Sequence, residues 1–80
     1  MDSEKLYSVV SDIITKEFGV PPENVKPKAE LVQELGLDSI DMCDALVHLE
    51  TMTGKPLPLE KYKTVVTIED FVDTTLKLVS

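Results

Sequence analysis

Apolar residues recur at intervals of three and four along three separate stretches of the chain. The first stretch lies within residues 2–18, the second begins at Ser39, and the third follows Thr67. This spacing places apolar side chains along one face of an α-helix. We therefore predict three long helices. Their inner faces carry Leu6, Val9, Val10, Ile13, Ile14 and Phe18 in the first, Met42, Ala45, Leu46 and Leu49 in the second, and Ile68, Phe71, Val72, Leu76 and Val79 in the third.

Capping residues and helix breakers define the expected ends of these helices. Asp38 precedes a second helix expected over residues 39–53, and Asp41 stands three residues later, close to a capping box. Thr67 and Asp70 repeat that spacing at the last helix. The other boundary residues are Asp2 or Ser3 before the first helix, Gly19, Pro21 and Pro22 after it, and Gly54 and Pro56 after the second.

A long connection over residues 19–37 separates the first two helices. Its prolines favour extended or turning backbone, and we expect a short helical turn near residues 30–35. Four apolar side chains can pin this loop to the core, and a shorter helix is expected over residues 59–63. The sequence thus predicts an all-α fold: a small bundle of three long helices plus one short helix, with a long first loop, forming one domain over residues 1–80. The four apolar loop residues are Val25, Leu31, Leu35 and Leu37.

The second predicted helix carries more apolar surface than one buried face requires. On a helical wheel of about 100° per residue, Ile40, Cys43 and Val47 form a second stripe that Glu50 separates from the inner face. A helix in a small bundle needs only one apolar face. Either a neighbouring loop covers the second stripe, or the stripe is a docking surface for another protein.

The charge distribution favours the docking surface. The net charge is −7, all eight cationic side chains are lysines, and residues 29–54 contain no lysine. An acidic rim around an apolar stripe would steer and orient a basic partner. The same charge argues against binding to nucleic acid or to an anionic membrane surface. The acidic residues of the stretch are Glu30, Glu34, Asp38, Asp41, Asp44 and Glu50.

The length and the reactive residues argue against an enzyme. Eighty residues leave little room for a deep, walled pocket. Cys43 has no base beside it in the pattern, and His48, the only histidine, is expected on the surface without metal-ligand spacing. We expect no catalytic residue and no metal site. The single cysteine, and the lack of any apolar run typical of a membrane span or leader, favour a cytoplasmic location. We also expect a monomer.

Residues 35–40 read Leu-Gly-Leu-Asp-Ser-Ile and place a serine at the expected start of the second helix. A hydroxyl in the first helical turn faces solvent, and the unpaired N–H groups and the helix dipole there favour an attached phosphate. Serine and aspartate are also common capping residues. From position alone, Ser39 is either an attachment site or a cap.

This segment resembles the attachment motif of the acyl carrier protein family, in which Asp-Ser-Leu or Asp-Ser-Ile opens the second helix. The order of helices, loop, glycine and proline matches that family over nearly the whole chain. The resemblance implies that Ser39 accepts 4′-phosphopantetheine from coenzyme A, installed by a Mg²⁺-dependent phosphopantetheinyl transferase, and that cargo is carried as a thioester on this arm. It also implies that partner enzymes are recognised by Asp38, Ile40, Asp41, Cys43, Asp44, Val47 and Glu50.

The resemblance therefore predicts a freestanding carrier and not an enzyme. Its partners would be acyl-loading, acyl-transfer or condensing enzymes with basic docking surfaces, in fatty acid, polyketide or specialised lipid biosynthesis. The chain departs from fatty-acid carriers after Glu50, where the usual glutamates and Phe are absent. It departs again after Gly54, where it has lysines in a stretch that is more often acidic in those carriers. A carrier of aminoacyl or peptidyl cargo, and an unmodified acidic interaction module, stay open as alternatives. The departing residues are Thr51, Met52, Thr53, Lys55, Lys61 and Lys63.

Overall fold

A computed structural model describes residues 2–80 of the chain. Its three α-helices are α1 (Ser3–Phe18), α2 (Ser39–Thr53) and α3 (Ile68–Val79). Two short 3₁₀ helices, η1 (Pro22–Asn24) and η2 (Leu59–Tyr62), lie in the connections. The predicted all-α fold is confirmed, and the short helix expected over residues 59–63 is present as η2. None of the helices in this part of the chain is both long and apolar enough to span a membrane.

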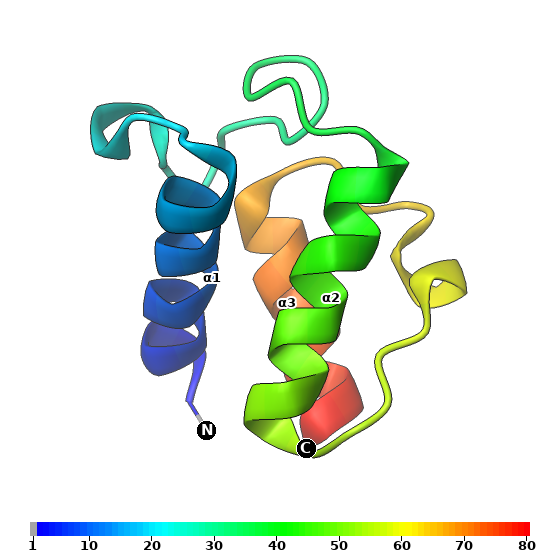
Figure 1. Ribbon diagram of the computed structural model, residues 1–80. Helices are drawn as coiled ribbons and strands as arrows, with labels where there is room; N and C mark the ends of the chain where they lie inside the picture. Colours follow the sequence, from blue (N-terminus) through cyan, green and yellow to red (C-terminus); the bar gives the residue numbers. More distant parts are fainter. Residues whose placement is uncertain (1) are drawn as a thin grey trace.

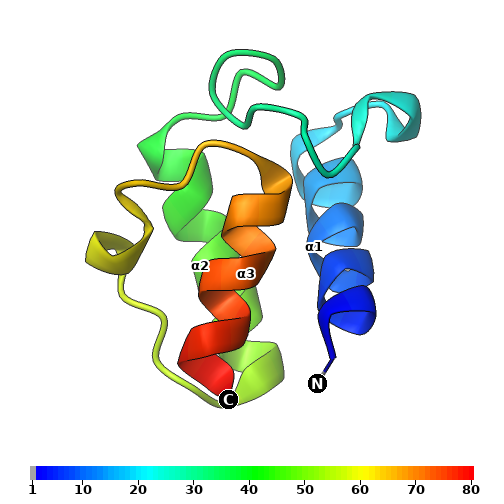
Figure 2. The ribbon, with the colours of Figure 1, turned by 180° about the vertical axis from the view of Figure 1, so that it is seen from behind.

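The three long helices form a bundle in which α1 runs opposite to α2 and α3 (Figure 1). α1 packs against both other long helices, and η2 also contacts α2 and α3. Seen from behind, the first loop crosses the end of the bundle where α2 and α3 begin (Figure 2). The start of α1 and the C-terminus lie at the opposite end. This arrangement places the first turn of α2 beside the loop.

Each long helix begins at a side chain that accepts a backbone N–H bond. Asp2 accepts from Lys5 N at 2.8 Å in α1. At α3, Thr67 Oγ1 accepts from Asp70 N while Asp70 Oδ2 accepts from Thr67 N, each at 3.1 Å. α1 and α2 both end at a glycine with φ of +70°, a conformation that other residues rarely adopt. The predicted helix boundaries are therefore confirmed.

The core joins the inner faces of the helices to side chains from the first loop. Leu31 and Leu37 are buried, whereas Val25 and Leu35 are half-buried against the same cluster, as the sequence predicts for a pinned loop. Tyr62 belongs to the same cluster and is only 4% exposed. The most deeply buried side chains are Leu6, Leu49, Leu57, Ile68, Phe71 and Thr75.

Backbone hydrogen bonds fasten the first loop to the start of α3. Leu31 N–H donates to Val66 O at 2.9 Å, and Ile68 N–H donates to Ala29 O at 3.1 Å, around an antiparallel bridge between Glu30 and Thr67. The expected helical turn at residues 30–35 follows at once, since Glu34 N–H donates to Glu30 O at 3.0 Å. The loop is consequently held at both a backbone bridge and a buried leucine.

A buried polar pair links η2 to α3. Tyr62 Oη and Thr75 Oγ1 are 2.7 Å apart, and Thr75 Oγ1 also donates to Phe71 O at 2.9 Å. The Tyr62 ring packs on Phe71 with centroids 5.0 Å apart. Burial raises the pKa of the Tyr62 phenol above 10.0, so it remains a hydrogen-bond donor at neutral pH. This pair fixes η2 against the bundle.

We predict that Thr75→Val destabilises the fold more than Tyr62→Phe does. Thr75→Val leaves the buried Tyr62 hydroxyl without a partner, at a cost of about 1–3 kcal/mol, whereas Tyr62→Phe costs about 1 kcal/mol. The double variant should lose less than the sum of the two, because no orphaned hydroxyl remains. Urea unfolding followed by circular dichroism measures all three. Strict additivity would contradict a coupled pair.

We also predict a specific acid sensitivity at the start of α3. Hydrogen bonds from the Thr67 and Val66 N–H groups lower the pKa of Asp70 below 3.8. The ionised carboxylate therefore stabilises the fold above pH 3.8, and this contribution is lost as the pH falls through the lowered pKa. Asp70→Asn should cost about 1 kcal/mol at pH 7, and its deficit from wild type should shrink in more acidic solution.

Urea unfolding at a series of pH values from neutral to strongly acidic measures that deficit. Asp73→Asn is the matched control, because Asp73 is exposed on the same helix. A deficit of Asp70→Asn that stays constant down to the lowest pH would show that the charge of Asp70 does not matter.

Candidate functional site

Ser39 is the first residue of α2 and is exposed to solvent. Asp38 supplies the cap: its Oδ1 accepts from Asp41 N at 3.0 Å, and Asp41 Oδ2 accepts from Asp38 N at 3.1 Å. The two carboxylates complete the capping box, and within residues 2–80 the Ser39 hydroxyl takes part in no hydrogen bond. The reading in which Ser39 itself caps the helix is therefore excluded.

An open groove of about 440 Å³ lies directly beside Ser39. Its walls come from the first loop, the first turn of α2 and the η2 region, three segments that the fold brings to the same end of the bundle. Most of the lining is apolar. The lining residues are Leu31, Val32, Asp38, Ser39, Met42, Leu59, Tyr62, Lys63 and Val65.

The second apolar stripe of α2 is uncovered. Ile40 is 78% exposed and Val47 58% exposed, and Cys43 lies exposed between them. The alternative in which a loop covers this stripe is therefore wrong. The three side chains form a continuous apolar strip along the outer face of α2, starting one residue after Ser39, because their spacing of three and four residues keeps them on one side of the helix.

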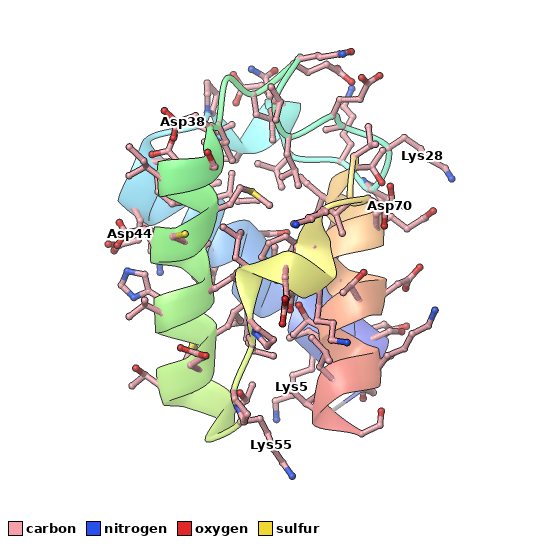
Figure 3. All side chains as sticks on the ribbon, turned by 90° about the vertical axis from the view of Figure 1, so that its right-hand side faces the viewer. Lys5, Lys28, Asp38, Asp44, Lys55 and Asp70 are labelled. Atoms are coloured by element: carbon pink, nitrogen blue, oxygen red, sulfur yellow. The ribbon has the colours of Figure 1, made fainter. Side chains whose placement is uncertain are left out.

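The acidic residues of α2 differ in their surroundings. Asp44 is exposed and points outward from the helix (Figure 3). Asp41 is half-buried in the capping box, and Glu50 Oε2 accepts from Leu57 N at 2.7 Å. Asp41 and Glu50 thus stabilise the two ends of α2 through hydrogen bonds within the chain. Either residue would contact a partner enzyme in addition to this structural role.

Charge is unevenly distributed around the bundle. Asp38 and Asp44 project from the outer side of α2, whereas the labelled lysines lie at the ends of the bundle or beside α3 (Figure 3). Lys28 Nζ pairs with Glu69 Oε1 at 2.8 Å near the start of α3. The outer face of α2 therefore presents negative charge with no lysine on the helix itself.

The two residues with potential reactivity, Cys43 and His48, do not form a catalytic pair. His48 Nε2 lies 3.2 Å from Glu17 Oε1, so its nearest partner belongs to α1. Within the described chain, no three His, Cys, Asp or Glu side chains gather closely enough to hold a metal ion. Cys43 contributes its small side chain to the exposed stripe.

The groove is the part of the site that the sequence did not predict. Val32 lies in the first loop, whose path the sequence does not define. The other three, Leu59, Lys63 and Val65, lie far from Ser39 along the chain. No local pattern brings these positions together. Only the bridge between the first loop and the segment before α3, together with the packing of η2, places them beside Ser39.

Comparison with known proteins gives a family for this geometry. Residues 8–75 match a family model described as "Phosphopantetheine attachment site". Acyl carrier protein 2 of Ralstonia nicotianae is 32% identical over 80 residues, which cover 100% of this chain and 99% of that protein. The acyl carrier protein of Rubrobacter xylanophilus is 30% identical over 73 residues, 91% of this chain and 90% of that one.

A further relative, the acyl carrier protein of Saccharopolyspora erythraea, is 25% identical over 80 residues, covering 100% of this chain and 84% of that protein. The family model covers most of the chain, and the relatives are matched over nearly their whole length. The family's cofactor is a covalently attached 4′-phosphopantetheine. The chain belongs to the acyl carrier protein family.

Proposed function

We propose that this protein is a freestanding carrier of acyl intermediates and that Ser39 is its attachment residue for 4′-phosphopantetheine. The main support is the state of the Ser39 hydroxyl, which is exposed at the first residue of α2. It forms no hydrogen bond with the described residues, because Asp38 caps the helix. A hydroxyl that the fold does not need is available for a phosphodiester. The family match makes that modification the expected one.

The residues around Ser39 fit such a group. Ser39 lines an open groove and is exposed to solvent, so its hydroxyl is accessible from outside the bundle. The first N–H groups of an α-helix lack intrahelical partners, so the start of α2 also offers donors and a favourable dipole to a phosphate. When bound, the arm supplies a thiol that carries cargo as a thioester. The chain itself holds the attachment point at a fixed helix end and leaves it accessible.

The outer face of α2 supports the recognition of partner enzymes. Ile40, Cys43 and Val47 are exposed next to Ser39, and Asp44 lies beside them. Burying an aliphatic side chain of this size contributes about 1.5–3 kcal/mol. Such a strip could provide contact energy, and the acidic side chains would orient a partner with a basic surface. The transferase and the acyl-handling enzymes would both approach from this side.

The finer identity of the cargo is part of the proposal. We infer acyl cargo, which the names of the relatives support. Fatty acid, polyketide or specialised lipid biosynthesis is our proposal for the pathway. Aminoacyl or peptidyl cargo remains an alternative, as does an unmodified acidic interaction module that would use the same exposed stripe. Four further points stay predictions: the carrier has no catalytic activity, it is a monomer, residues 1–80 form a single domain, and the protein is cytoplasmic.

We predict that Ser39 is the only residue that accepts the arm. Incubation with coenzyme A, Mg²⁺ and a broad-specificity phosphopantetheinyl transferase should add one phosphopantetheine to the wild type and none to Ser39→Ala. Intact mass spectrometry measures the gain, and Ser8→Ala, an exposed serine on α1, is the control that should load normally. An unmodified wild type, or equal loading of Ser39→Ala, would refute the proposal.

We also predict that Asp44→Lys slows arm transfer without weakening the fold. The exposed carboxylate has no structural role, so reversing its charge should reduce the transfer rate about three- to tenfold at low salt, with less effect at high salt. Asp41→Lys is a poorer test because it also breaks the capping box. Transfer time courses at several salt concentrations, each with a thermal melt, separate these effects.

Asp73→Lys is the control for Asp44→Lys. Asp73 is exposed on α3, beside Tyr7 of α1 and away from the groove at Ser39, and its substitution makes the same change in net charge. If both variants transfer the arm equally slowly, the effect reflects total charge, and local steering by Asp44 is ruled out.

A further inference from the structure

The groove beside Ser39 contains one basic side chain, Lys63. Lys63 directly follows η2, is exposed, and forms no ion pair with any of the residues 2–80. The remaining polar residues of the lining are Asp38, Ser39 and the tyrosine whose hydroxyl is already bonded to Thr75. The groove therefore combines an unpaired ammonium, a free hydroxyl and apolar walls.

Two carboxylates near Ser39 oppose the favourable effect of the helix dipole on a negative charge. Asp38 directly precedes Ser39, and the carboxylate of Asp41 also faces the first turn in the capping box. A phosphodiester on Ser39 would lie within a few residues of both. Like charges at such separations repel, and an opposite charge nearby offsets that repulsion. The fold supplies one candidate cation on the groove side.

We propose that Lys63 pairs with the phosphodiester formed on Ser39 and thereby directs the arm into the groove between α2 and η2. This inference rests on the proposed function, since it requires Ser39 to be modified. Lys63 is a positioning residue: it touches the attachment phosphate and leaves the cargo end free. The apolar walls formed by Val32, Leu59 and Val65 then accept the uncharged part of the arm.

Three other lysines, Lys28, Lys55 and Lys61, are less suited to this role. Lys28 is engaged by Glu69, and Lys55 follows the far end of α2 (Figure 3). Lys61 lies on η2 itself, two residues from Lys63, but does not line the groove. Lys61 is therefore a matched control for Lys63, because both are exposed lysines of the same short segment.

Paramagnetic relaxation in the loaded protein tests this proposal. Coenzyme A with a nitroxide on its thiol is used to load wild type, Lys63→Glu, Lys63→Arg and Lys61→Glu. Intact mass spectrometry confirms one label on each, and amide spectra confirm the fold. Relaxation enhancement is then compared between groove residues Val32, Tyr62 and Val65 and the outer-face residue Val47, at about 20 mM and about 500 mM salt.

We expect the groove amides to be enhanced more strongly than Val47 in the wild type, in Lys63→Arg and in Lys61→Glu. In Lys63→Glu the groove enhancement should fall at least about twofold, and high salt should reduce it in the wild type but not in that variant. An identical pattern in Lys63→Glu and wild type would overturn the role of Lys63 while leaving the carrier function intact. Failure of Ser39 to load would instead reject the carrier function and this inference with it.

Discussion

The site depends on the reciprocal hydrogen bonds between Asp38 and Asp41. They start α2 at a defined residue, and they satisfy two backbone N–H groups with side chains other than Ser39. Without this capping box, the serine would be the next hydroxyl able to cap the helix. Because the two aspartates cap the helix, α2 fixes the position of Ser39 while the Ser39 hydroxyl needs no hydrogen bond to the backbone. A modification of that hydroxyl then removes no interaction on which the fold relies.

The second constraint is the position of α1, which covers both other long helices and leaves the outer face of α2 bare. A chain of 80 residues has little apolar surface to spare for stability. Keeping Ile40 and Val47 in solvent forgoes burial that could have stabilised the bundle. The fold offsets this with a well-packed interior, the buried Tyr62–Thr75 pair and a first loop tied by its backbone to the start of α3.

The sequence predicted the parts of the molecule that local physics determines. Helix ends follow from caps and glycines, and the second apolar stripe of α2 follows from the helical period, so both can be predicted from the sequence. The groove could not be found in this way. Lys63 and Val32 meet Ser39 only because Leu31 and Val66 share a backbone hydrogen bond and Tyr62 is buried, and these are contacts between distant segments. Glu50 shows the same limit: its charge is visible in the sequence, but the hydrogen bond that it accepts from Leu57 N–H is not.

The interior and the groove share two side chains, Leu31 and Met42. The centre of a water-sized sphere can move within only about 10 Å³ of the interior seam, close to the minimum for one water molecule. An aliphatic chain therefore has no room in the packed bundle and must displace side chains to enter. Met42 is half-buried and unbranched, so it can change rotamer at lower cost than Leu31, which is 2% exposed and anchored by the N–H bond to Val66. Of the two shared side chains, Met42 is therefore the easier one to displace, and it lies about one turn along α2 from Ser39.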